Sequence, residues 1–253
     1  GDIDALRNLD FVRRAIRGAG EWAQLRTTYF DSEERRLARR GLSLRIREEA
    51  GVAALTAKIG EAGASSVKRR EYERIVDPGA RDFVTGIPEI DEMIGKDVSD
   101  LEPIARTATN RWSAIVSDLG AVIELSSEIG CAESFAPERR AAAVAEIEIE
   151  LLKGPPGALF EWARRLVLAS DGRLRLSVET KLERAMRAGA SPEFGKAPRA
   201  LLPQSSRADE ILGATLAPIA IRVIETSTEV AAAHDREAAR QLRVALRRLR
   251  SLE

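Results

Sequence analysis

The segment AEIEIELLKG, residues 145–154, alternates glutamate with isoleucine so strictly that it predicts a β-strand with one charged face. Successive side chains of a strand point to opposite faces, so Glu146, Glu148 and Glu150 would form a carboxylate row, with neighbours about 6–7 Å apart. Carboxylates this close repel one another unless a positive group lies among them. The row is therefore either the solvated face of an amphipathic strand or a site that holds a cation, and the other strands decide between these interpretations.

Other short segments predict strands whose polar faces carry charges, with positive charges on some strands and glutamates on others. Arg45 and Arg47 share one face of LSLRIRE, and Lys58 lies on the polar face of AALTAKIG. Solvated faces usually mix both signs within a strand, so segregation by strand indicates that the charged faces converge on a shared polar interior, as in a closed barrel. The other predicted strands are VKRREYERIV, with Arg69, Glu71 and Glu73 on one face, the weaker AVIELSSE, AEIEIELL, and RLRLSVETKLER, with Arg175, Ser177, Glu179 and Lys181 in phase.

Helices are predicted among these strands, so we expect an α+β fold: a closed antiparallel β-barrel with surrounding helices. An amphipathic helix is predicted in DIDALRNLDFVRRAI near the start, and another, GALFEWARRLVLAS, lies between two strands. A barrel interior of this kind suits a highly charged ligand, because its cationic strands would bind an anion and its carboxylates a divalent cation. With oxygen ligands only, that cation would be Mg²⁺ or Mn²⁺.

Composition excludes several classes of site. The chain has 40 basic and 40 acidic residues, so its net charge indicates no partner. The only cysteine is Cys131 and the only histidine is His234, which excludes an intramolecular disulfide and a zinc site built from His and Cys. The longest uncharged stretch, residues 211–221, is too short to span a bilayer, and the start has no apolar signal region. We therefore expect a soluble cytoplasmic protein without a membrane partner.

The C-terminal part has a different pattern. Residues 191–206 are rich in proline and lack periodicity, which predicts a linker, and two helices are predicted in residues 207–253. Five arginines of the last helix would fall within an arc of roughly 80° and form an arginine stripe. Phosphate is the natural partner for such a stripe, and the absence of interleaved aromatic residues argues against nucleic acid. The stripe consists of Arg236, Arg240, Arg243, Arg247 and Arg250.

Five motifs, in this order, resemble the CYTH domain of the triphosphate tunnel metalloenzymes: TTYFDSEERRLARRGLSLRIREE, TAKIG, KRREYE, AEIEIELLKG and ETKLERAMR. The C-terminal AARQLRVALRRLRS is similar to the start of a CHAD domain, a helical module associated with polyphosphate. The resemblance implies a CYTH-like tunnel domain over residues 1–190, a linker over 191–206 and a CHAD-like helical segment over 207–253.

For a CYTH domain, the resemblance implies metal-dependent hydrolysis of inorganic triphosphate inside the barrel. Three alternatives remain: a non-catalytic polyphosphate-binding module, a thiamine triphosphatase and an adenylyl cyclase. Carried over by motif, the metal ligands would be Glu128, Glu146, Glu148 and Glu150, supported by Glu71 and Glu73. The substrate-binding residues would be Arg45, Arg47, Lys58, Arg69, Arg111, Lys181 and Arg184, of which Lys58, Arg111 and Lys181 would also be catalytic.

The sequence departs from the two family patterns at three places. CYTH domains open with a Glu-x-Glu-x-Lys strand, whereas this chain starts with the helix expected to follow it. Without that strand, part of the metal site and one phosphate-binding lysine would be missing, which favours the non-catalytic alternative. Glu128 stands where the family has aspartate before a glycine, which keeps the charge but lengthens the arm. Arg240 stands where CHAD domains have a histidine before QLRV.

Overall fold

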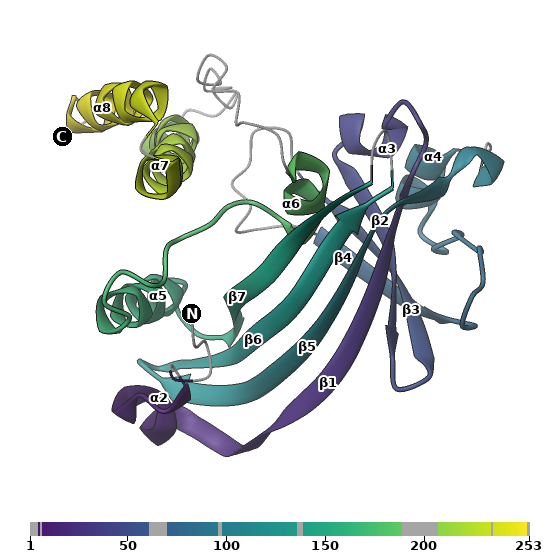
Figure 1. Ribbon diagram of the computed structural model, residues 1–253, viewed down its shortest axis with the longest axis horizontal. Coiled ribbons are helices and arrows are strands. Elements are labelled where there is room, and N and C mark those ends of the chain that lie inside the picture. The colour runs from purple at the N-terminus through teal and green to yellow at the C-terminus, as the bar shows by residue number, and fades with distance from the viewer. Residues whose placement is uncertain are drawn as a thin grey trace.

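The protein, described by a computed structural model, forms one seven-stranded antiparallel sheet in the order β4-β3-β2-β1-β5-β6-β7 (Figure 1). The structure describes residues 5, 7–60, 70–95, 98–135, 139–188, 207–233 and 235–251. Strands that follow one another in the chain pair as neighbours, and only the link from β4 to β5 crosses the sheet, which places β1 in its centre. The strands are β1 (Ile16–Asp31), β2 (Leu42–Glu49), β3 (Val52–Ile59), β4 (Arg70–Val76), β5 (Glu102–Asp118), β6 (Ala121–Ser134) and β7 (Arg140–Lys153).

The predicted closed barrel is wrong, because the sheet is open between its edge strands β4 and β7. The segment RLRLSVETKLER also does not form the predicted strand: residues 174–179 are irregular, and helix α6 (Lys181–Arg187) follows them. A capping box explains the helix. The Thr180 hydroxyl accepts a hydrogen bond from the backbone N–H of Glu183, and the Glu183 carboxylate accepts one from the N–H of Thr180. These local bonds end the extended conformation at Thr180.

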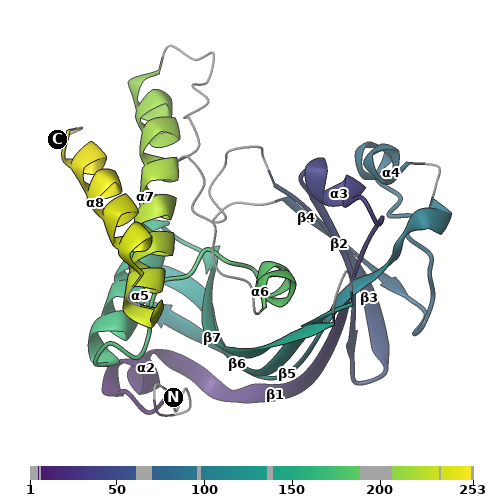
Figure 2. The ribbon, with the colours of Figure 1, turned by 45° about the horizontal axis from the view of Figure 1, so that its top comes forward.

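The sheet curves into a trough, and α6 lies on its concave side (Figure 2). Ala185 of α6 is fully buried in a small apolar cluster with Tyr29, Ala105 and Val144 from three strands. Leu182 and Met186 of α6 pack against the same cluster. The apolar face of α6 therefore fixes the helix to one part of the concave face and leaves the rest of that face to polar side chains.

Two apolar clusters hold the other face of the sheet. The first lies where α3 (Arg36–Arg39), α4 (Pro88–Ile94) and the 3₁₀ helix η1 (Val98–Asp100) adjoin β2 and β3, and it includes Leu44, Leu55 and Ile90. The second lies under α2 (Asp10–Ala15) and α5 (Gly157–Ala169), with Trp162 fully buried. Helix α5 confirms the helix predicted in GALFEWARRLVLAS. The predicted N-terminal helix corresponds to α2, which ends at Ala15, and the next residue, Ile16, begins β1.

The C-terminal residues form a helical hairpin of α7 (Ala208–Ala233) and α8 (Arg236–Arg250), so the two predicted helices are present. Asp235 caps α8 by accepting a hydrogen bond from the N–H of Ala238 at 2.7 Å. Within α7, the stretch Ile211–Ala231 is long and apolar enough to cross a membrane by length and composition, although the uncharged run within it is shorter. Apolar core helices of soluble proteins also have this length and composition.

Candidate functional site

The charged residues of the strands lie on the concave face, as the pairing register shows. Arg47 of β2 stands opposite Thr27 of β1, and Thr27 stands opposite Thr107 of β5. Further along the sheet, Arg111 of β5 stands opposite Glu128 of β6, and Glu128 opposite Glu146 of β7. Residues directly opposite each other in a sheet share a face. The members of this polar face are Thr27, Tyr29, Arg45, Arg47, Thr56, Lys58, Glu71, Glu73, Thr107, Thr109, Arg111, Glu124, Ser126, Glu128, Glu146, Glu148 and Glu150.

One side of the polar face is a cationic cluster of Arg45, Arg47, Lys58 and Arg111. Glu71 of β4 accepts contacts from the Lys58 ammonium at 2.8 Å and from the Arg45 guanidinium at 3.3 Å. Burial and the nearby Arg45 nevertheless lower the pKa of Lys58 below its ordinary value, against the opposing effect of Glu71. Glu71 therefore does not by itself balance the charges of Arg45, Arg47 and Lys58, whereas Arg111 pairs with Glu124.

Arg47 is the least compensated member of the cationic cluster. Among the residues that the structure describes, it forms no ion pair, and its buried Nε has no hydrogen-bond partner. Burial is the main cause that lowers the pKa of Arg47, and the guanidinium groups of Arg45 and Arg111 lower it further. A half-buried cation among cations is unfavourable unless an anion accompanies it, so this position suits an anionic ligand.

Arg111 joins the cationic cluster to the acidic side of the face. Its Nη2 lies 2.6 Å from Glu124 Oε1, and its Nε lies 4.0 Å from Glu128 Oε1. Glu128 is almost fully buried, and its other oxygen accepts a hydrogen bond from the Thr109 hydroxyl at 3.0 Å. Arg111 is therefore placed to contact an anion on the cationic side while Glu124 and Glu128 hold its guanidinium group.

On the acidic side, the Lys181 ammonium of α6 lies among three carboxylates. Its Nζ is 2.5 Å from Glu146, 2.8 Å from Glu148 and 3.4 Å from Glu128. Burial alone would raise the pKa of Glu148, but the Lys181 ammonium outweighs it and lowers that pKa to about 2. Burial alone would likewise lower the pKa of Lys181, yet these carboxylates raise it above its ordinary value. Both groups are therefore charged at neutral pH.

The acidic side has the donor chemistry for a hard divalent ion, but Lys181 stands where that ion would bind. Three carboxylates converge within 3.4 Å of one cationic nitrogen, and oxygen ligands are those that Mg²⁺ and Mn²⁺ prefer. In the described part of the chain, no group of three or more carboxylate, His or Cys ligands has the spacing of a metal site. A metal ion on this side would therefore require Lys181 to move away from the carboxylates.

The structure places most of the predicted site residues on or over one face. The strands contribute the cationic cluster together with Glu128 and the carboxylate row, and α6 contributes Lys181 and Arg184, which lies 2.8 Å from Glu146. Arg69 falls outside the described residues, and the arginine stripe lies on α8 rather than on the sheet. Sequence reasoning missed Glu124 and the buried threonines, although the alternation of Thr107, Thr109 and Arg111 along β5 is a signal that could have found them.

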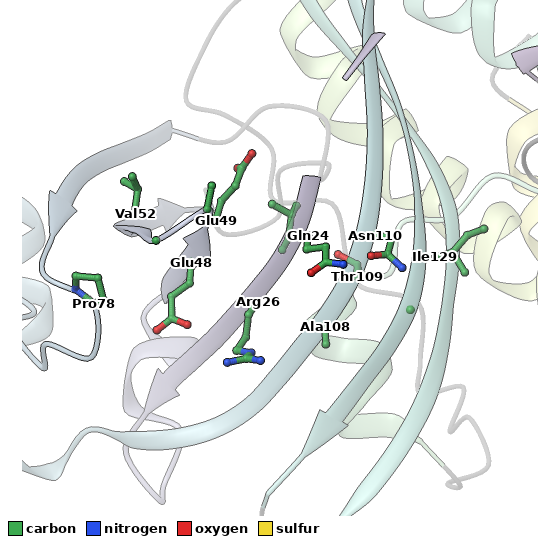
Figure 3. Close-up of a pocket in the computed structure, with 14 residues that line it drawn as sticks. Gln24, Arg26, Glu48, Glu49, Val52, Pro78, Ala108, Thr109, Asn110 and Ile129 are labelled. Atoms are coloured by element: carbon green, nitrogen blue, oxygen red, sulfur yellow. The ribbon is translucent and has the colours of Figure 1, made fainter. Parts of the chain in front are cut away.

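A separate pocket lies on the opposite face of the sheet (Figure 3). Its lining side chains include Gln24, Arg26 and Asn110. These residues alternate along β1 and β5 with Thr27, Thr109 and the other members of the polar face, so they point away from it. This pocket is therefore distinct from the charged site.

The solved structures that resemble the chain share less than a fifth of its residues. They include one from Bacillus halodurans that is named an adenylate cyclase, with 16% identity and a TM-score of 0.49, covering 72% of this chain and 89% of that one. HpAC1 from Hippeastrum, described with a dominant triphosphatase activity, has 15% identity and a TM-score of 0.45, covering 73% and 89%. The protein PH1819 from Pyrococcus horikoshii has 17% identity and a TM-score of 0.40, covering 74% and 93%.

No curated protein matches the chain. The family profile of the CYTH domain matches residues 12–186, which include all seven strands, helix α5 and nearly all of α6. This match ends before the C-terminal hairpin, whose similarity to a CHAD domain stays a prediction. With most of its length matched, the chain belongs to the CYTH domain family.

Proposed function

We propose that the polar face binds inorganic triphosphate and that the protein hydrolyses it with a divalent metal ion. CYTH domains in general bind triphosphate substrates, and the enzymes among them generally depend on divalent metals. The observation that supports this function best is Arg47, a half-buried guanidinium without an ion pair among the described residues, beside Arg45 and Arg111. A triphosphate would supply the negative charge that this cluster lacks.

The residues divide the chemistry between them. Arg45, Arg47 and Lys58 would neutralise the phosphate oxygens and hold the phosphate chain in one orientation, a task that suits the fixed fork of guanidinium groups. Arg111, which joins the cationic and acidic sides, and Lys181 of the acidic side would stabilise the charge that develops on the transferred phosphoryl group. Arg184 would assist them from α6.

The acidic side would hold the metal ion. Glu146, Glu148 and Glu128 would bind Mg²⁺ or Mn²⁺ once Lys181 has moved toward the phosphate, and Glu150 lies at the exposed end of the same row. When bound there, the ion supplies Lewis-acid polarisation of a phosphoryl oxygen. A carboxylate of the row would orient the attacking water.

A non-catalytic triphosphate-binding module is the second candidate. Lys181 and Arg184 already neutralise Glu146, at 2.5 and 2.8 Å, so the acidic side is satisfied without a metal ion. A protein that only bound the anion would need the cationic cluster and not the carboxylates. The two candidates therefore differ in what they require of the carboxylate row.

Replacing Glu148 and Glu150 together with glutamine separates the candidates. If the protein is a hydrolase, phosphate release from tripolyphosphate with Mg²⁺ or Mn²⁺ should fall at least about a hundredfold, while metal-free tripolyphosphate binding is kept or improves. Glu133→Gln is the matched control, because Glu133 lies on β6 one residue out of phase with the polar face. Binding without hydrolysis by the unmodified protein would favour the non-catalytic module, and hydrolysis unaffected by the double substitution would make the row a solvated face.

We further propose that the arginine stripe of α8 binds polyphosphate. All five arginines are exposed, and within the described chain only Arg240 forms an ion pair, with Glu237. The opposite face of α8 buries Ala238 and Ala245, so the helix presents its charge to solvent while its small residues pack. A phosphate chain lying along such a stripe would release counterions as it bound.

A further inference from the structure

Arg187, in the last turn of α6, joins this helix to the C-terminal hairpin. Its Nη1 lies 2.6 Å from Oε1 of Glu229, a residue of α7. Its Nε and Nη2 bind the two oxygens of Glu179 at 2.7 and 3.0 Å, which is the bidentate geometry that a guanidinium favours. The Arg187 side chain of α6 therefore contacts both Glu179, in the segment before this helix, and Glu229 of α7.

The same contacts continue to the carboxylates of the polar face. Glu179 also lies 3.7 Å from Arg184, and Arg184 lies 2.8 Å from Glu146. Charges alternate in sign along the series Glu229, Arg187, Glu179, Arg184 and Glu146. A displacement of Glu229 would therefore change the contacts of Arg187 and, through Glu179, those of Arg184 with Glu146.

Helix α6 depends on such contacts for its position. It has seven residues, and helices this short are marginal in water without tertiary support. Its apolar side packs on the sheet through Ala185, and Arg140 of β7 donates a hydrogen bond to the carbonyl of Ala188 at its end. Among the described residues, Arg187 forms the one ion pair between this helix and α7. Helix α6 in turn places Lys181 among Glu128, Glu146 and Glu148.

We propose that Arg187 is a positioning residue through which Glu229 of α7 holds Lys181 among the carboxylates, where its ammonium competes with a divalent metal ion. The C-terminal hairpin then sets how readily the acidic side accepts that ion. The inference rests on the part of the proposed function that assigns metal binding to these carboxylates. When Lys181 leaves them, its charge becomes available to a phosphate on the cationic side.

Mn²⁺ binding to the full chain without phosphate, measured by calorimetry and by electron paramagnetic resonance at low salt, tests the competition. Lys181→Met removes the ammonium and should tighten Mn²⁺ binding at least about tenfold, because a like charge a few ångströms away is lost. Glu229→Gln should act in the same direction and more weakly, about twofold to tenfold, since Lys181 remains but is held less firmly. Arg187→Lys keeps the charge without the fork and should give a smaller change.

The double variant Lys181→Met/Glu229→Gln should bind Mn²⁺ no more tightly than Lys181→Met alone, because the link acts through Lys181. Glu237→Gln is the control, since it removes an ion pair within α8 of the same hairpin. Unchanged or weaker Mn²⁺ binding by Lys181→Met would overturn the competition. Lower thermal stability of Glu229→Gln with unchanged Mn²⁺ affinity would show that the link is only structural and would overturn the positioning role.

Metal-free tripolyphosphate binding by the same proteins keeps this inference separate from the proposed function. If the unmodified protein binds no tripolyphosphate, the proposed function fails whatever the Mn²⁺ results are. If it binds tripolyphosphate and Lys181→Met binds no Mn²⁺, anion binding stands and the inference about Arg187 and Lys181 fails.

Discussion

At the scale of single residues, the surroundings of Arg47 disfavour the positive charge of its guanidinium group. Burial and the neighbouring Arg45 and Arg111 lower its pKa, whereas Arg45 and Lys58 at least share the carboxylate of Glu71. Groups held in unfavourable surroundings reduce the stability of the empty protein and are typical of binding sites. Because Arg47 forms no ion pair with any residue in the described ranges, its guanidinium indicates a role in binding and not in stability.

Asp31 is also buried, but in contrast to Arg47 it has a structural role. Its carboxylate lies at the end of β1 and accepts hydrogen bonds from the backbone N–H groups of Ser32, Leu37 and Ala38 at 2.9, 2.8 and 3.1 Å. Arg35, which precedes α3, has a left-handed backbone (φ 58°) and provides no side-chain cap. Asp31 therefore satisfies the donors with which α3 begins.

Asp31→Ala should lower the free energy of unfolding by roughly 1–3 kcal/mol, because buried backbone donors would lose their acceptor. Urea denaturation measures this loss. Asp10→Ala is the control. The Asp10 side chain is 81% exposed, and its one ion pair with the described residues is to Arg14 at 3.8 Å, so its removal should change stability by less than about 0.5 kcal/mol. Equal losses in the two variants would contradict the capping role of Asp31.

At the scale of elements, strict alternation predicted β2, β3 and β7, because each has apolar residues on one face and charges on the other. The sequence did not reveal β1 and β5 as strands. Their concave residues are largely uncharged, such as Thr27 and Thr107, and register shifts interrupt the pairing of the two strands near Arg17 and Tyr29. Because β1 and β5 lie in the middle of the sheet, the strand pattern did not show how the cationic and acidic strands are joined, although the resemblance identified Arg111 of β5.

The segment before α6 shows how a local preference overrides a pattern. Leu174, Leu176 and Val178 alternate with polar residues as in a strand, yet the chain stays irregular and turns into a helix at the Thr180 capping box. Pairing in a sheet depends on partners far away in sequence, whereas a capping box needs only four residues. The motif still identified Lys181 and Arg184, but it could not show that a helix places them over the carboxylates.

At the scale of the whole molecule, the protein has two separate cationic surfaces, one in the trough and one on the hairpin. The arginine stripe spans roughly 21 Å at the helical rise of about 1.5 Å per residue. Helix α8 packs on α7, and α7 reaches α6 through Glu229 and Arg187. Because the stripe lies on α8 and not on the sheet, a long polyphosphate would bind it independently of the trough.

Replacing Arg243 and Arg247 together with glutamate should weaken binding of long-chain polyphosphate at least about tenfold and reduce its salt dependence by about two phosphate contacts. Tripolyphosphate binding in the trough should not change. The control is Arg13→Glu/Arg17→Glu, which makes the same charge change at exposed residues near the N-terminus. If polyphosphate binding and its salt dependence are unchanged while thermal stability falls, the stripe is a structural surface.

Calorimetry of tripolyphosphate binding without metal, at low salt, tests most directly whether the cationic cluster of the trough binds a triphosphate. Arg47→Ala should weaken binding at least about tenfold, because a desolvated guanidinium contributes strong charge-assisted hydrogen bonds to phosphate. Arg26→Ala, which removes an exposed arginine from the opposite face of the sheet, should leave the affinity as it is. Equal affinity of Arg47→Ala and the unmodified protein would contradict a triphosphate site in the trough.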